Sequence, residues 1–242
     1  MPNTTETVLA ERLSAIDLEA MTREFNDANQ LIVIPNFIPS IIVDELCSTL
    51  PRLESSVHRN FIPKYKKGGS ISRYDLDRHA PVFGDLYRSP ALRAYFNNLA
   101  KQTLIDCPLD DPHTYALYYY TEPGDHIGYH YDTSYYKGAR YTVLIGLVDD
   151  SSCKLECQLY KDDPNRDTEQ RAIQLAPGTM VFFNGDNLYH RITPLGENEQ
   201  RIALTLEYLT TTQMNPWLRF ISNMKDSIAY FGFKQVFSRR QS

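Results

Sequence analysis

The sequence predicts an all-β core of jelly-roll type, a double-stranded β-helix, with helices before it and one helix after it. Eight short segments between residues 114 and 209 are rich in β-branched and aromatic side chains, and clusters of turn residues separate them. Before residue 114, apolar residues recur at spacings of three and four, which is typical of amphipathic helices. Many short strands joined by turns favour a barrel or sandwich.

The chain has 242 residues, with 42% hydrophobic and 23% charged residues, which fits one globular domain over residues 1–242. The formal net charge of −5 argues against a nucleic-acid partner, because such partners usually require a basic face. The short basic run Lys64, Lys66 and Lys67 is interpreted as a solvated turn.

No apolar stretch is long enough to span a bilayer, so no membrane partner is expected. The first residues lack the charged head and apolar middle of a signal peptide, and a cytosolic location is expected. Disulfides are then not expected among the four cysteines. Cys153 and Cys157 have a spacing that metal sites use, but without a second Cys/His pair nearby they are read as buried thiols.

The helical part covers about residues 1–113. Residues 5–29 predict one or two helices, and the apolar run 31–37 predicts a short strand that proline ends. A second helix is expected to begin at Pro39 and Ser40. Another helix is expected over residues 86–104, with Ser89 and Pro90 as an internal start.

Two further segments complete the expected domain around the jelly-roll core of about residues 114–209. Residues 58–74 are polar and contain glycine, which predicts a long loop that acts as a lid over substrate. After the core, Asn215 is a candidate cap for a helix from Pro216 to about Tyr230, within a C-terminal part of about residues 215–242.

A candidate metal site lies in the stretch from Glu122 to Asp132. In an extended segment His130 and Asp132 point the same way, because residues two apart share a face. His190, near the end of a later strand, offers a third ligand. Two histidines and one carboxylate with open positions form the facial triad of non-haem Fe(II) oxygenases.

Arg201 begins the strand that follows His190 in the sequence. A guanidinium there would point into the same cavity and could hold a carboxylate through two hydrogen bonds. Each of the three candidate ligands, and Arg201, also has a simpler structural interpretation. His130 could be a surface histidine, Asp132 a turn former, His190 a core histidine, and Arg201 half of a salt bridge. Their order, on strands of one β core, favours the metal site.

The residues His130, Asp132, His190 and Arg201 resemble the motif of the Fe(II)/2-oxoglutarate-dependent dioxygenases, over roughly residues 114–208. The resemblance implies that the two histidines and the aspartate bind Fe(II). It implies that Arg201 binds the distal carboxylate of 2-oxoglutarate. The hydroxyl of Tyr118 could be a further contact, with packing in the core as an equal alternative for this residue. It also implies that O2 is a cosubstrate and that succinate and CO2 are products.

Residues 119–147 more narrowly resemble the free-amino-acid halogenase and hydroxylase branch of these enzymes. In that branch, halogenating members carry a small residue in place of the metal-binding carboxylate, which opens a position for chloride. Here the position holds Asp132. The resemblance therefore implies a hydroxylase, although related enzymes also desaturate or cyclise their substrates.

Three residues are candidates for contact with an amino-acid substrate. Arg73, in the expected loop, could hold the substrate carboxylate, and Glu122 and His126 could meet its ammonium group. His126 lies four residues before His130 and so is expected on the same strand face. At a rise near 3.3 Å per residue it is about 13 Å from His130, too far to be a fourth ligand.

The sequence thus predicts an Fe(II)- and 2-oxoglutarate-dependent oxygenase that hydroxylates a small polar molecule, most directly a free amino acid or a derivative. A hydroxylase of a residue within a peptide is an alternative that would need an open groove. An oxidative desaturase or cyclase of a natural-product pathway is another. A binding module without catalysis would require the loss of a ligand, and the sequence retains all three. The oligomeric state is not predicted.

Overall fold

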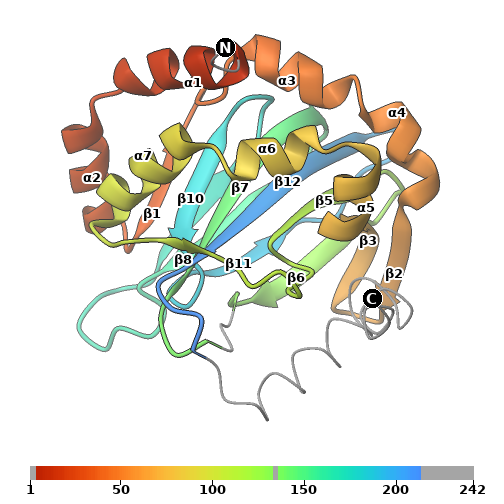
Figure 1. Cartoon of the computed structure of the whole chain (residues 1–242). Coiled ribbons are helices and arrows are strands. Elements are labelled where there is room, and N and C mark those ends of the chain that lie inside the picture. The colour runs from red at the N-terminus through yellow and green to blue at the C-terminus, as the bar shows by residue number, and fades with distance from the viewer. Residues whose placement is uncertain (1–3, 133–135, 214–242) are drawn as a thin grey trace.

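The computed structural model describes residues 4–132 and 136–213. Within these ranges, twelve strands form a single antiparallel sheet that curls on itself (Figure 1). The strands are β1 (Leu31–Ile34), β2 (His58–Ile62), β3 (Lys66–Ser72), β4 (Ile105–Asp106), β5 (Tyr115–Tyr120), β6 (His126–His130), β7 (Arg140–Asp150), β8 (Leu155–Leu159), β9 (Glu169–Ile173), β10 (Met180–Asn184), β11 (Tyr189–Ile192) and β12 (Gln200–Leu209).

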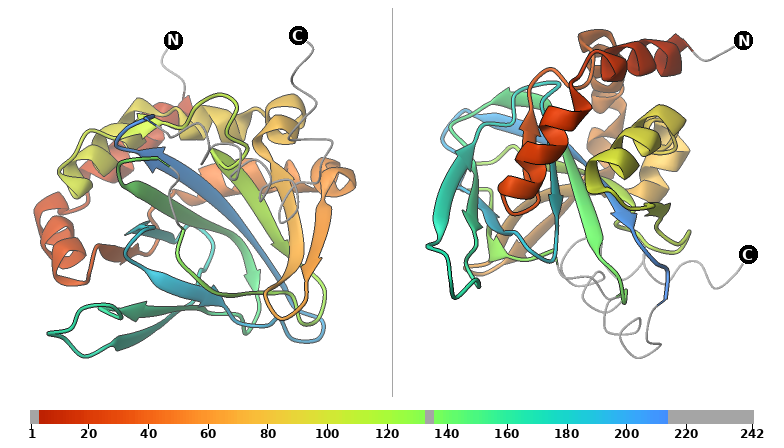
Figure 2. Two further views of the ribbon diagram at one scale, coloured as in Figure 1. Left: turned by 90° about the horizontal axis from the view of Figure 1, so that it is seen from below. Right: turned by 90° about the vertical axis from the view of Figure 1, so that its left-hand side faces the viewer.

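The strand order β1-β10-β7-β12-β5-β3-β6-β11-β8-β9 divides the sheet into two parts. Strands β1, β10, β7, β12 and β5 form the larger part, and β3 connects it to the smaller part of β6, β11, β8 and β9. In the left-hand view of Figure 2, the smaller part is drawn in the lower half of the picture and the larger part above it. This arrangement confirms the predicted jelly-roll core, and the eight strands predicted between residues 114 and 209 correspond to β5 through β12.

The helices cover the outer face of the larger part of the sheet, as both figures show. They are α1 (Thr4–Ser14), α2 (Leu18–Asp27), α3 (Ser40–Cys47), α4 (Leu50–Leu53), a 3-10 turn (Glu54–Ser56), α5 (Arg73–His79), α6 (Val82–Tyr87) and α7 (Pro90–Ala100). Helix α7 begins as predicted, because the Ser89 side chain accepts a hydrogen bond from the Leu92 N–H. No helix in the described part of the chain is both long and apolar enough to cross a membrane.

Side-chain alternation gives the larger part of the sheet two different faces. On β10, Phe182 points toward the helices and packs against the rings of Phe25, Phe96 and Tyr141 at centroid distances of 5.0–5.3 Å. The next residue, Phe183, belongs to a second apolar cluster inside the curled sheet. The helices therefore seal the outer face, and the inner face is left for a site.

The prediction of a long lid-like loop over residues 58–74 was wrong. Residues 58–72 form the β2–β3 hairpin, and β3 pairs with both β5 and β6. A Cβ at position 69 would lie 2.6 Å from Val57 Cγ1, so Gly69 permits close packing of β3 against the residue just before β2. Glycine at this position marks a tight contact in the sheet and not the expected loop.

The single helix expected over residues 86–104 is interrupted, because α6 ends at Tyr87 and α7 covers only Pro90–Ala100. The predictions of the first helices and of the buried thiols are confirmed. The expected helices at the N-terminus correspond to α1 and α2, and α3 begins at Ser40. All four cysteines are free thiols, and Cys153 and Cys157 are fully buried. The predicted C-terminal helix lies outside the described residues.

Candidate metal centre

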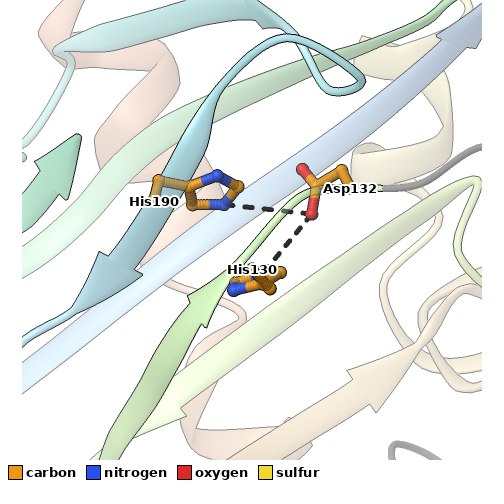
Figure 3. Close-up of side chains that lie close together, drawn as sticks. All are labelled: His130, Asp132 and His190. Atoms are coloured by element: carbon orange, nitrogen blue, oxygen red, sulfur yellow. Dashed lines mark ion pairs between the residues drawn. The ribbon is translucent and has the colours of Figure 1, made fainter. Parts of the chain in front are cut away.

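Three side chains meet inside the curled sheet, two from the adjacent strands β6 and β11 and one from the segment just after β6 (Figure 3). His130 is the last residue of β6 and pairs with His190 of β11, while Asp132 lies two residues beyond His130. Asp132 Oδ1 is 3.4 Å from His130 Nε2 and 3.8 Å from His190 Nε2. One ligand atom from each residue lies within 4.8 Å of the other two, a spacing that suits a single metal ion.

Backbone carbonyls fix the orientation of both imidazole rings. The Nδ1 atom of His130 is 2.8 Å from the Gly128 carbonyl oxygen, and that of His190 is 3.0 Å from the Leu188 carbonyl oxygen. Because a carbonyl oxygen only accepts, each Nδ1 carries the ring proton and each Nε2 has a free lone pair. Both lone pairs are then available to a metal on the side where Asp132 lies.

The charges of the three groups favour a metal ligand set. Burial alone would raise the pKa of Asp132, but His190 and His130 outweigh it and hold that pKa well below its usual value. Burial lowers the pKa of His190 to about 4, so this ring is neutral near pH 7. Burial also opposes a charge on His130, but its hydrogen bond with Asp132 raises the pKa. A metal at this point competes with the proton on His130.

A cavity opens beside the three residues, between the larger and smaller parts of the sheet. Apolar side chains form much of its wall, and polar groups cluster near the histidines. Its lining residues are Tyr118, Tyr120, Ile127, His130, Asp132, Thr142, Leu144, Leu155, His190, Ile192, Arg201, Ala203, Thr205 and Glu207. The predicted metal ligands, Arg201 and Tyr118 are thus brought together.

Arg201 lies at the start of β12 and is only 2% exposed. Its guanidinium carbon is 5.2 Å from the centroid of the Tyr120 ring, and the two side chains are hydrogen-bonded. Within the described residues its Nε is buried and has no hydrogen-bond partner. A buried cationic donor of this kind favours an anionic ligand, and a carboxylate matches its planar fork.

Lys66 is a residue of the site region that the sequence reading misplaced. The expectation of a solvated turn is wrong for this residue, which is 1% exposed, and burial lowers the pKa of its ammonium group well below the usual value. Its Nζ lies 5.3 Å from the centroid of the Tyr118 ring, and its charge opposes protonation of His130. The misplacement has a structural cause, because Lys66 begins β3 and this strand enters the sheet beside β6.

His126 does not share the cavity face with His130, contrary to the expectation from strand alternation. His190 pairs with His130 but Ile192 pairs with Ile127, so the β6 strand contains one extra residue in this interval. Such a bulge reverses the alternation, and Ile127 lines the cavity in place of His126. The His126 Nδ1 instead lies 2.8 Å from the Gly124 carbonyl oxygen.

Arg73 lies on the opposite side of the sheet from the cavity. It begins α5, donates hydrogen bonds to Thr114 and Asp77, and lies 5.6 Å from the ring centroid of Tyr115. Tyr115 belongs to the cluster that the helices cover. The expected contact between Arg73 and substrate therefore has no support in the structure, because β5 separates the two.

Glu122 also lies outside the cavity lining, and its side chain is 55% exposed. Its carboxylate forms an ion pair with Arg59 at 3.0 Å and a second one with Lys67 at 3.6 Å. These partners satisfy its charge, and the expected contact between Glu122 and a substrate ammonium is not supported by its position.

Two buried residues of the cavity were not singled out from the sequence. Thr142 of β7 and Glu207 of β12 face each other across paired strands, and Arg140 donates a hydrogen bond to the Glu207 carboxylate at 2.9 Å. Burial raises the pKa of Glu207 to about 7, against the opposing charge of Arg140. No local motif marks these residues. The available signal was a threonine and a glutamate at inward-facing positions of otherwise apolar strands.

The pKa of Glu207 leads to a prediction about stability. Its pKa is about 7 in the folded chain against an ordinary value of 4.5, so the folded state binds more protons between these values. The contribution of Glu207 to the free energy of unfolding should therefore fall as the pH rises from about 4.5 to about 7. The measurement is urea unfolding of the metal-free protein across this range, for the wild type and Glu207→Gln. The variant should lose this part of the pH dependence, and equal slopes would contradict the prediction.

Residues 13–139, a little over half of the chain, match the model of the family described as Halogenase D. The match ends beyond Asp132 but before His190 and Arg201, so two parts of the site lie outside it. No curated protein matches the chain.

Solved structures with the same fold include an epimerase and two prolyl hydroxylases. One is the epimerase SnoN from nogalamycin biosynthesis in complex with Fe3+, alpha ketoglutarate and nogalamycin RO (TM-score 0.66, 14% identity, 82% of this chain and 86% of that chain). A second is a prolyl hydroxylase from Trichoplax adhaerens with a peptide fragment (0.64, 17%, 92% and 98%). A third is a Pseudomonas putida prolyl-4-hydroxylase (0.57, 15%, 80% and 98%). At these identities the likeness shows the fold.

Proposed function

The chain belongs to the halogenase D family of Fe(II)/2-oxoglutarate-dependent oxygenases, and we propose that it is a hydroxylase of a small polar molecule, most directly a free amino acid or a close derivative. One observation carries the choice of hydroxylation over halogenation. Asp132 places a carboxylate oxygen between the two histidines, at the position where halogenating relatives are expected to have a small residue. A third protein ligand at that position excludes a halide.

In this proposal His130, His190 and Asp132 hold Fe(II). The donor set fits the ion, because two neutral imidazole nitrogens and one carboxylate are the ligands of non-haem iron oxygenases. The Gly128 and Leu188 carbonyls keep the lone pairs of both rings directed at the ion. When bound, the metal with 2-oxoglutarate and O2 supplies the oxidising chemistry.

Arg201 is proposed to bind the distal carboxylate of 2-oxoglutarate. Its buried Nε, without a partner in the described part of the chain, fits a ligand that brings its own acceptor. Tyr118 lines the same cavity and is proposed to add a hydroxyl contact. The apolar wall formed by Ile127, Leu144 and Ile192 excludes water, which strengthens the interaction between Arg201 and an anion.

The size and class of the substrate are proposed from the family, since the expected lid loop is a hairpin and no longer argues for a closed pocket. The resemblance of residues 119–147 to the free-amino-acid halogenase and hydroxylase branch supports a small amino-acid-like molecule. The shared fold includes enzymes whose structures hold a small natural product and a peptide, so a peptidyl hydroxylase is the second candidate. A cytosolic location stays a prediction from the first residues of the sequence, and the absence of a nucleic-acid partner stays a prediction from the net charge.

The test is release of succinate with Fe(II), 2-oxoglutarate and each free amino acid in turn, under air and in the presence of chloride. We expect one amino acid to stimulate succinate release and to gain the mass of one oxygen atom. A chlorinated product would contradict the hydroxylase assignment. A loss of two hydrogens would instead identify a desaturase or cyclase.

A second panel of short peptides separates the two substrate classes. Stimulation by a peptide, with no response to any free amino acid, would contradict the small-molecule proposal and favour the peptidyl alternative. As a control, Asp132→Ala protein in chloride-free buffer should release no succinate above background with any compound, which shows that the signal comes from this site.

A further inference from the structure

The two oxygens of the Asp132 carboxylate have different surroundings. Oδ1 faces the Nε2 atoms of His130 and His190, whereas Oδ2 accepts a hydrogen bond from Thr142 Oγ1 at 2.8 Å. The backbone N–H of Asp132 donates to the Gly185 carbonyl oxygen at 3.0 Å, which fixes the main chain as well. A Cβ at Gly185 would lie 2.8 Å from the Asp132 Cβ, so this approach requires glycine. The carboxylate is thus held in one orientation.

Thr142 is itself held in place by a buried neighbour. It is 1% exposed, and its Oγ1 lies 3.0 Å from Glu207 Oε2, on the strand paired with its own. A threonine hydroxyl has one proton to donate. If both Asp132 and Glu207 were ionised, one of the two short contacts would join two acceptors, which is costly in a buried site. A proton on Glu207 gives every contact a donor, with Glu207 donating to Thr142 and Thr142 donating to Asp132.

The charged groups around Glu207 are compatible with this directed chain. Arg140 of β7 donates through Nε to Glu207 Oε2 at 2.9 Å and is itself 9% exposed. Asp132 faces Glu207 from the far side of Thr142, and its negative charge disfavours a second ionised carboxylate. Cys107 and Asp111 act on Arg140 from outside the cavity. The chain of contacts runs from Arg140 through Glu207 and Thr142 to the outer oxygen of Asp132.

We propose that Thr142, supported by Glu207, is a positioning residue that restricts Asp132 to metal coordination through Oδ1 alone. The hydroxyl holds Oδ2 toward Thr142 and leaves Oδ1 facing both histidines, so a bound metal would meet Oδ1 and keep its other positions for cosubstrate and O2. The inference rests on the proposed metal site of His130, Asp132 and His190. It adds a residue whose side chain does not bind the metal and that no feature of the sequence identified.

Three variants test the role of the hydroxyl. Thr142→Val removes the donor at nearly constant shape, and Thr142→Ser keeps it. Thr179→Val is the matched control, since Thr179 is a buried threonine that does not line the cavity. Co(II) is the probe, and its affinity and visible absorption spectrum are measured without 2-oxoglutarate. Thermal unfolding of the metal-free proteins shows separately whether a substitution has damaged the fold.

We expect Thr142→Val to bind Co(II) about 10- to 100-fold more weakly, as is usual when a partner of a metal ligand is removed. Its spectrum should change, because the freed carboxylate can bind through both oxygens. Thr142→Ser and Thr179→Val should stay within a few-fold of the wild type and keep its spectrum. Wild-type affinity and spectrum in Thr142→Val would overturn the inference.

The failure of the metal site itself would look different. Wild-type protein that binds no Co(II) would contradict the proposed site and this inference together. Wild-type protein that binds Co(II) while Thr142→Val behaves identically would contradict only the role of Thr142. Loss of affinity in Thr142→Val and Thr142→Ser alike, with unfolding temperatures unchanged, would also overturn it, because the hydroxyl would then not be what matters.

Discussion

Replacing Asp132 by alanine is expected to lower substrate hydroxylation by at least about 100-fold, since even the outer partners of metal ligands are worth 10- to 100-fold. The physical reason is the loss of the single anionic ligand between His130 and His190. Without it, two neutral imidazoles carry the whole protein contribution to binding Fe(II). The measurement is succinate release at saturating Fe(II) and 2-oxoglutarate in chloride-free buffer, because the family resemblance implies that chloride fills the vacated position in halogenating relatives.

The matched control is Asp167→Ala, which removes an exposed aspartate that does not line the cavity. This control should retain wild-type turnover, and its net charge equals that of Asp132→Ala. Normal hydroxylation by Asp132→Ala, with product mass unchanged, would exclude Asp132 as a required ligand. The iron would then need a different set of protein groups.

Changing Arg201 to alanine is expected to raise the KM for 2-oxoglutarate by roughly 30-fold to several thousand-fold. Truncating one partner of a buried, hydrogen-bonded charge pair costs about 2–5 kcal/mol, and about 1.4 kcal/mol is a factor of ten in affinity. Arg201 meets the condition of burial, with 2% exposure. The KM for 2-oxoglutarate and the KM for the amino-acid substrate are measured separately. Only the KM for 2-oxoglutarate should change strongly.

Two further arginine variants make this result specific. Arg201→Lys keeps the charge but loses the planar fork, and should give an intermediate KM for 2-oxoglutarate. Arg191→Ala removes a half-exposed arginine that pairs with Glu156, and should leave the KM unchanged. An unchanged KM in Arg201→Ala would place the cosubstrate anchor on another residue, with Lys66 as the next buried cation near the site.

Most of the fold could be predicted from the sequence because its strands and helices have strong local patterns. Strands β5 to β12 alternate or run apolar between clear turns, and Ser89 with Pro90 marks the start of α7. The strands within residues 58–72 could not be predicted, because the lysines and glycines of this segment form no strand pattern of their own. Their pairing comes from β5 and β6, which lie far along the chain and impose an extended conformation.

The residues of the site also divide into those that could be predicted from local sequence and those that could not. His130, Asp132 and His190 could be predicted because their chemistry is specific and their strands are easy to recognise. The face of His126 could not, because the bulge in β6 depends on its register with β11. Thr142 and Glu207 could not be predicted either, since their roles arise only from contact across paired strands.

The most direct test of the whole account is the anaerobic titration of Fe(II)-loaded protein with 2-oxoglutarate, followed by the visible charge-transfer absorption of an iron chelate with a 2-oxo acid. In the wild type, we expect the absorption band to grow until one equivalent of 2-oxoglutarate has been added. In His190→Ala it should be absent, and in Arg201→Ala it should require a much higher concentration of 2-oxoglutarate. A wild type that binds iron without developing the band, or a His190→Ala variant that develops it fully, would contradict the assignment of this site.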